Sequence, residues 1–166
     1  MNYFAYGSNM SLARLSARIP SVRKLGVGAV SGYRLMFHKA GERDGSAKCD
    51  AFFTGDPSHE VMGVVYEMDA GEKDRLDAIE GVGFGYENRL VEVRMSEGVV
   101  VTAWLYCATI IDSSMKPFDW YLEHVVRGAQ ENSLPPDYIG GILAVEAVSD
   151  PDTERASRER SIHGRT

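Results

Sequence analysis

The stretch Asn2-Tyr3-Phe4-Ala5-Tyr6-Gly7-Ser8-Asn9-Met10 decides how this chain starts to fold. Residues 2–6 form an apolar and aromatic run typical of a short buried strand, and the Gly-Ser-Asn sequence after it favours a turn. Residues 11–18 then have the composition of a helix. The stretch therefore predicts a strand, a tight turn and a helix in immediate succession.

The next hundred residues are predicted to be mostly sheet. Strands are expected at 32–38, 51–54 and 61–68, because segments rich in Gly, Asp, Ser and Pro separate them. The D-x-x-E pattern at 69–72 predicts a capped helix start, and Gly81 is a suitable end for that helix. Residues 89–95 and 99–107, joined by Ser-Glu-Gly, predict a hairpin.

Two late helices complete the expected fold. One begins near Pro117, and a shorter one follows Pro135-Pro136. Many strands without regular strand–helix alternation indicate an α+β domain over residues 1–149 with a mixed sheet. Periodicity alone does not tell whether this sheet closes into a barrel. Residues 150–166 hold four acids, four arginines and almost nothing apolar, so we expect a mobile tail.

Composition excludes several classes of function. The 166 residues are 44% hydrophobic and 25% charged, with a net charge of −6 and no basic run, so nucleic acid is not an expected partner. No uncharged stretch reaches the roughly 18 to 20 residues that span a membrane, and the absence of a signal-peptide pattern favours the cytoplasm. Two distant cysteines and four scattered histidines predict neither a disulfide nor a metal site, and no glycine motif fits a dinucleotide cofactor.

The turn at Tyr6-Gly7-Ser8-Asn9 is a candidate anion site. Free backbone amides between a strand and a helix start can bind a carboxylate. The alternative is an ordinary glycine turn in which Asn9 or Ser11 caps the helix. Ser8 is not a convincing nucleophile, because its surroundings lack the G-x-S-x-G pattern.

Glu80 is the second candidate, at the expected C-terminal end of its helix. The negative end of the helix dipole disfavours another negative charge, a situation that suits a carboxyl group exchanging protons. The alternative is a solvated surface glutamate. Three glycines in residues 81–85 predict a flexible loop before Tyr86, whereas Tyr106 and Tyr121 are explained by themselves as core aromatics.

Four ordered segments together resemble the gamma-glutamylcyclotransferase family. They are F-A-Y-G-S-N-M at 4–10, G-V-V-Y-E-M at 63–68, L-D-A-I-E-G-V at 76–82 and G-A-Q-E-N-S-L-P at 128–135. The similarity spans about residues 2–150. It implies a single-domain mixed β-barrel with flanking helices, often a homodimer, acting on a small-molecule gamma-glutamyl substrate without metal or cofactor.

The resemblance also implies a site and a reaction. Glu80 corresponds to the family's catalytic glutamate, and the substrate-binding residues correspond to Tyr6, Gly7, Ser8, Asn9, Tyr86, Tyr106 and Tyr121. The implied reaction converts a gamma-glutamyl amino acid or peptide to 5-oxoproline and a free amine. Alternatives are a gamma-glutamyl amine or a gamma-glutamylated biosynthetic intermediate as substrate, or a noncatalytic module that binds a small metabolite. We expect the loops at 40–48 and 112–116 to contact the leaving amine.

Overall fold

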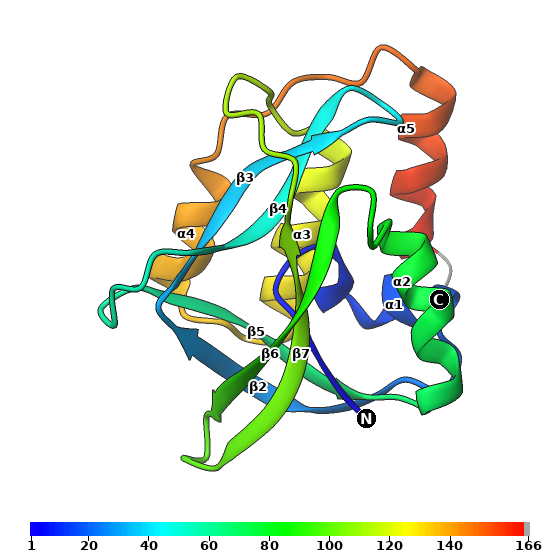
Figure 1. Cartoon of the computed structure of the whole chain (residues 1–166). Helices are drawn as coiled ribbons and strands as arrows, with labels where there is room; N and C mark the ends of the chain where they lie inside the picture. Colours follow the sequence, from blue (N-terminus) through cyan, green and yellow to red (C-terminus); the bar gives the residue numbers. More distant parts are fainter. Residues whose placement is uncertain (165–166) are drawn as a thin grey trace.

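The computed structural model describes residues 1–164, which form seven strands and a set of short helices (Figure 1). In chain order the elements are β1 (Asn2–Ala5), η1 (Ser8–Met10), α1 (Leu12–Arg18), β2 (Arg23–Ser31), β3 (Tyr33–Gly41), β4 (Ser46–Phe53), β5 (Glu60–Glu67), η2 (Ala70–Glu72), α2 (Lys73–Glu80), β6 (Tyr86–Met95), β7 (Val100–Ala108), α3 (Asp119–Glu131), α4 (Pro136–Leu143), α5 (Thr153–Arg160) and η3 (Ser161–Gly164).

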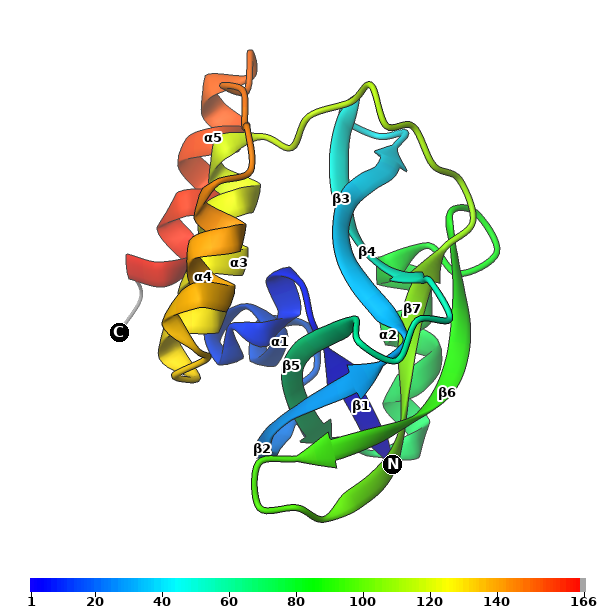
Figure 2. The same ribbon diagram turned by 90° about the vertical axis from the view of Figure 1, so that its left-hand side faces the viewer.

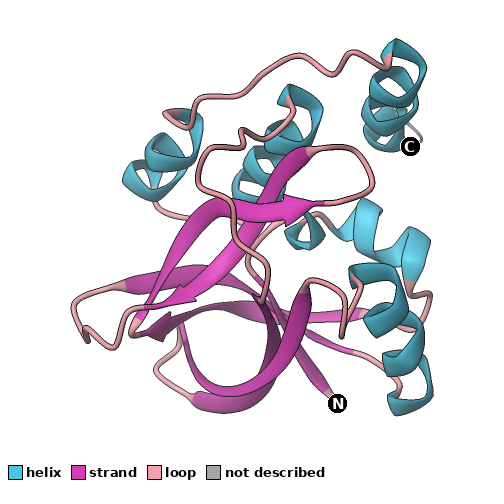
Figure 3. Ribbon diagram, turned by 45° about the horizontal axis from the view of Figure 1, so that its top comes forward, coloured by secondary structure: helices cyan, strands magenta, loops and turns pink. Residues whose placement is uncertain are grey.

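Five strands close into a barrel in the order β1-β5-β2-β6-β7 (Figure 3). Neighbouring strands are antiparallel except at the closure, where β1 runs parallel to β7 through the pair Tyr3 and Trp104. The mixed barrel that the resemblance implied is therefore confirmed. Side chains such as those of Phe4, Val64 and Leu105 are completely buried in the core.

A second, two-stranded sheet and a helical layer accompany the barrel. β3 and β4 form an antiparallel ribbon, and Figure 2 shows α3, α4 and α5 standing together on one side of the molecule, opposite β6 and β7. The turn η1 lies against α3. A Cβ atom at Gly128 of α3 would come 2.6 Å from Met10 Cβ and 2.7 Å from Ser11 N, so glycine is what permits this close approach.

Within residues 1–149 most predicted elements are confirmed, with two differences. The hairpin forms as β6 and β7, and α2 ends at Gly81 in the left-handed conformation (φ 77°). The first difference is β2, which was not predicted as a strand because its sequence is rich in glycine. In the structure it pairs with both β5 and β6. The second is the expected capping box at 69–72, which does not form: Asp69 makes no side-chain capping bond, its amide donates to Ser21 Oγ at 3.0 Å, and Glu72 accepts hydrogen bonds from Ser21.

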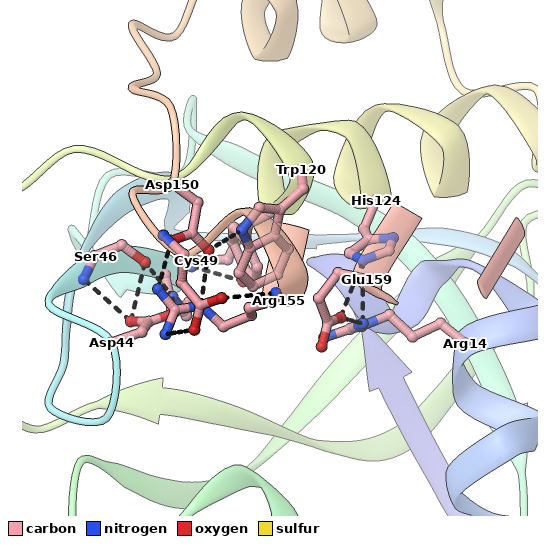
Figure 4. Close-up of polar contacts among 12 residues, drawn as sticks. Arg14, Asp44, Ser46, Cys49, Trp120, His124, Asp150, Arg155 and Glu159 are labelled. Carbon is pink, nitrogen blue, oxygen red and sulfur yellow. Dashed lines mark hydrogen bonds and ion pairs between the residues drawn. The ribbon is translucent and has the colours of Figure 1, made fainter. Parts of the chain in front are cut away.

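The expectation of a mobile tail was wrong for residues 150–164. This segment forms α5 and η3, with Asp152 Oδ1 capping α5 through the Arg155 amide at 2.8 Å. The segment has few apolar side chains, and polar contacts hold it in place instead (Figure 4). Asp150 accepts hydrogen bonds from Trp120 Nε1 and Arg155 Nε, both at 2.7 Å. The remainder of the predicted tail, residues 165 and 166, lies outside the described residues.

Candidate active site

The turn after β1 is buried and does not act as an ordinary helix cap. Ser8 and Asn9 are only 8% and 4% exposed, and the Met10 amide closes the turn by donating to the Gly7 carbonyl at 2.9 Å. Ser11 holds the capping position of α1, but its hydroxyl makes no capping bond. Within residues 1–164, the amides of Gly7, Ser8 and Asn9 donate to no protein acceptor. They therefore have hydrogen-bonding capacity for a ligand.

Glu80 meets this turn from the last position of α2. Its Oε1 atom accepts hydrogen bonds from Asn9 Nδ2 at 3.0 Å and from Arg18 Nη1 at 2.7 Å. Its side chain is 18% exposed, so the glutamate is neither free on the surface nor completely enclosed. The two candidates, 71 positions apart in the chain, thus form one hydrogen-bonded group.

The Asn9 amide is oriented from both of its ends. Its nitrogen also donates to the Tyr3 hydroxyl at 3.1 Å, while its oxygen accepts from Arg18 Nη1 at 2.9 Å. Sequence reasoning missed Tyr3 and Arg18 as members of the site. Arg18 carries no motif of its own, since it is simply a basic residue in the last turn of α1.

Three of the predicted tyrosines form hydrogen bonds to backbone atoms of β4 or β7. The Tyr86 hydroxyl donates to the Cys49 carbonyl at 2.6 Å, and the Tyr121 hydroxyl accepts from the Cys49 amide at 3.0 Å. The Tyr6 hydroxyl donates to the carbonyl of Tyr106. Burial raises the pKa of Tyr6, Tyr86 and Tyr121 well above the ordinary value, so all three stay protonated near neutral pH.

The fourth tyrosine is bound to a carboxylate. The Tyr106 hydroxyl donates to Asp77 Oδ1 at 2.7 Å, and burial raises the Tyr106 pKa far above its ordinary value. Burial also raises the pKa of Cys49 to about 12, so this thiol does not supply a thiolate nucleophile. Among the predicted site residues, Glu80 is the one that carries a carboxylate.

All eight predicted site residues line one small cavity of about 20 Å³. The lining consists of Tyr6, Gly7, Ser8, Asn9, Glu80, Tyr86, Tyr106 and Tyr121, together with Tyr3 and Cys49. A volume of this size holds about one water molecule. A larger cleft of about 710 Å³ shares Ser8, Glu80, Tyr86 and Tyr121 with it. Glu80 thus lies where a small inner cavity joins a cleft of ligand size.

The cleft is locally positive although the chain is acidic. Five cationic residues and three anionic residues line it; the cations are Arg14, Arg18, Lys39, Arg43 and Lys48, and the anions are Glu42, Asp44 and Glu80. The predicted contact loop at 40–48 contributes several of them, whereas residues 112–116 do not line the cleft. This charge balance suits a substrate that bears carboxylates.

The described residues contain neither a metal-binding cluster nor a membrane-spanning helix. Among residues 1–164, no three His, Cys, Asp or Glu side chains are grouped so as to bind a metal ion. None of the described helices has the length and apolar character needed to cross a membrane. Cys49 and Cys107 are both buried and unbridged.

Comparison with known proteins gives consistent relatives. Residues 60–142 match the AIG2-like family. The chain is 33% identical over 147 residues to human gamma-glutamylcyclotransferase, covering 87% of this chain and 78% of the human protein. The mouse gamma-glutamylcyclotransferase is 34% identical over 149 residues, with the same coverage.

Solved structures agree with this pattern. A gamma-glutamyl cyclotransferase structure superposes with a TM-score of 0.82 at 29% identity, covering 95% of this chain and 98% of that one. A yeast gamma-glutamyl cyclotransferase specific to glutathione superposes with a TM-score of 0.63 at 12% identity, covering 96% of each chain. The second similarity is one of fold alone.

Proposed function

This chain belongs to the gamma-glutamylcyclotransferase family, and on that premise we propose that it converts a gamma-glutamyl amino acid or peptide to 5-oxoproline and a free amine. In this proposal Glu80 is the general acid–base, and the turn from Tyr6 to Asn9 binds the glutamyl group. The observation that supports it most is the 3.0 Å hydrogen bond between Asn9 Nδ2 and Glu80 Oε1 at the rim of the cavity.

The reaction needs only the substrate and a proton carrier. The α-amine of the glutamyl group attacks its own δ-carbonyl, so that a C–N bond forms within a five-membered lactam. The bond between the same carbon and the leaving nitrogen then breaks. The Glu80 carboxylate takes a proton from the α-ammonium and delivers it to the leaving nitrogen, returning to its original state, and the second proton that the ring nitrogen loses passes to the released amine. No water molecule is consumed.

The protein's main contribution is to hold the glutamyl chain in its folded shape. Correct orientation of reacting groups can supply up to about 7–11 kcal/mol of the barrier. The amides of Gly7, Ser8 and Asn9 are suited to bind the α-carboxylate or to stabilise the developing oxyanion. Arg18 is a positioning residue, since it fixes both Glu80 and Asn9 from one nitrogen.

The cavity sizes indicate how a substrate would lie. The inner cavity of about 20 Å³ is smaller than a glutamyl group, so the reacting atoms are expected at its junction with the cleft of about 710 Å³. The neutral tyrosine hydroxyls form the inner wall. The leaving amine then extends along the cleft, past Tyr86 and the loop at 81–84 that also lines it.

A panel of gamma-glutamyl compounds tests this function. The purified protein should release 5-oxoproline and the free amine in equal amounts, and in water enriched in oxygen-18 the 5-oxoproline should remain unlabelled. Release of glutamate would indicate hydrolysis and contradict the proposal. Turnover confined to gamma-glutamyl amines would favour the alternative substrate class, and binding without any product would favour a noncatalytic module.

Assembly and location follow the same premise. We propose a homodimer in the cytoplasm, a compartment in which the two unbridged cysteines would stay reduced. Sedimentation equilibrium of the full chain distinguishes a dimer from a monomer.

A further inference from the structure

Lys39 places an unpaired ammonium in the wall of the cleft. The residue lies in β3 and is only 9% exposed, with its Nζ atom 5.0 Å from the centroid of the Tyr86 ring. Within residues 1–164 this ammonium makes no ion pair and no hydrogen bond, and burial lowers the pKa of Lys39. The Tyr86 ring provides a cation–π contact, but a buried ammonium without an ion pair or a hydrogen bond still costs stability, so its position calls for a reason.

The backbone fixes where Lys39 lies. A register shift between β3 and β4 leaves His38 as the extra residue, and Lys39 then pairs directly with Lys48. Such bulges change the direction of the side chains that follow them. Lys39 also forms a bridge to Ile111, and the Ala40 amide donates to the Ile110 carbonyl at 3.0 Å. The ammonium is therefore attached to backbone that two neighbouring segments hold.

Lys39 and Lys48 lie opposite each other on β3 and β4, and only Lys48 has a carboxylate as a direct partner. Lys48 Nζ lies 2.7 Å from Asp44 Oδ2, and both residues line the cleft. Like charges opposite each other on neighbouring strands destabilise a sheet. Asp44 forms a direct ion pair with Lys48, whereas among the described residues Lys39 has only the longer-range attraction of Glu42, Glu80 and Asp44. A ligand carboxylate would supply the missing negative charge.

The position of Lys39 indicates which carboxylate of the substrate it would contact. Tyr86 lines both the inner cavity and the cleft, but Lys39 lines only the cleft. With the glutamyl group at the inner cavity, Lys39 lies on the outer side of the Tyr86 ring, next to the leaving amine. Because the inner turn has its own amides for the glutamyl α-carboxylate, Lys39 is suited to a second carboxylate farther along the substrate.

We propose that Lys39 binds a carboxylate on the leaving amine and so selects gamma-glutamyl amino acids and peptides over neutral gamma-glutamyl amines, an inference that rests on the proposed cyclotransferase function. Lys39 acts here as a specificity-determining residue. Charged hydrogen bonds of this kind contribute enough to change kcat/KM by roughly 10- to 100-fold.

Two matched substrates test the inference: gamma-glutamyl-alanine and gamma-glutamyl-ethylamide, which differ only in the alanine carboxylate. The unaltered protein should prefer the alanine compound by roughly tenfold or more in kcat/KM. Lys39→Met should remove that preference, mainly through a higher KM for gamma-glutamyl-alanine, and leave the ethylamide unaffected. Lys39→Arg should restore part of the preference.

Lys116→Met is the control, because Lys116 is a surface lysine paired with Glu146 outside the cleft, and it should leave both substrates unchanged. Equal losses for both substrates in Lys39→Met would assign Lys39 to the glutamyl carboxylate or to a structural role, and would overturn the inference. So would equal use of the two substrates by the unaltered protein, a result that needs no variant. If the unaltered protein forms 5-oxoproline from neither, the proposed function fails and the inference falls with it.

Discussion

Two arginines on one short helix pair with carboxylates in opposite surroundings. Arg18 of α1 contacts Glu80, which lines both the inner cavity and the cleft. Arg14, one turn earlier, contacts Glu159 of α5 at 2.7 Å, and Glu159 lines neither. An ion pair alone therefore does not mark a functional carboxylate. The cavity and the Asn9 amide beside Glu80 are what distinguish it.

The second pair belongs to a polar cluster that extends away from the cleft, which Arg14 also lines. Arg14 Nη1 lies 3.2 Å from His124 Nε2, and His124 Nδ1 lies 2.6 Å from His163 Nε2 (Figure 4 shows the first of these contacts). His124 is completely buried, and that burial lowers its pKa. We infer that this cluster attaches the C-terminal helix to the rest of the protein, whereas the role proposed for the Arg18–Glu80 pair is to position the general acid–base.

The largest difference between the two pairs should appear in stability. Arg14→Met should lower the free energy of unfolding by about 1.5–3 kcal/mol, because the Arg14 side chain is only 8% exposed and its loss leaves Glu159 with the longer contact to His124 at 3.4 Å. Arg18→Met should cost about 1 kcal/mol or less, since the Arg18 side chain is 24% exposed and Glu80 keeps its hydrogen bond from Asn9. Urea denaturation of both variants measures the two values. Equal losses of unfolding free energy in the two variants would contradict the view that only the Arg14–Glu159 pair is mainly structural.

The stability that Glu159 contributes should depend on pH in the acid range. The hydrogen bond from His124, together with that from Arg14, lowers the pKa of Glu159 from 4.5 to about 2, against the opposing effect of burial. The folded state thus binds this proton less readily than the unfolded state, and the stabilisation present above pH 4.5 is lost as pH falls toward 2. A Glu159→Gln variant should be less stable near neutral pH and should converge with the unaltered protein in acid. A constant gap across that range would contradict this.

Arg18 should matter for turnover more than for folding. Replacing it with methionine removes the charge that positions Glu80 and Asn9, so we expect kcat to fall roughly tenfold. Arg23→Met provides the control, because Arg23 forms an exposed pair with Glu67 on the outside of the barrel. Steady-state assays of 5-oxoproline release compare the two. Unchanged kcat in Arg18→Met would show that Glu80 needs no such partner.

The smallest effect is expected for a pair on the surface. Glu146 and Lys116 are 75% and 43% exposed, so Glu146→Gln should change the free energy of unfolding by less than about 0.5 kcal/mol. The same urea experiment applies. A loss comparable to that of Arg14→Met would mean that burial does not determine the strength of these pairs.

The sequence predicted the parts of the molecule that depend on local pattern. The β6–β7 hairpin and the glycine end of α2 follow from periodicity and turn chemistry. Barrel closure does not, because the Tyr3–Trp104 pairing joins residues about one hundred positions apart. The tail was misjudged for a related reason, since partners such as Arg14 and Trp120 come from distant helices.

The candidate site divides in the same way. Motif resemblance named Asn9 and Glu80, and the structure places them in contact, while their catalytic and binding roles stay predictions. Arg18 and Lys39 could not be found from sequence. Arg18 matters only because α1 and α2 meet, and Lys39 only because a bulge turns it toward the cleft.

The most direct test of the central claim is the rate of 5-oxoproline formation by Glu80→Gln at saturating gamma-glutamyl-alanine, with substrate affinity measured in parallel by calorimetry. Loss of a general acid–base should lower kcat by about 100- to 10,000-fold. Affinity and the urea midpoint should stay close to those of the unaltered protein. A variant that binds substrate and forms 5-oxoproline at the unaltered rate would contradict the role proposed for Glu80.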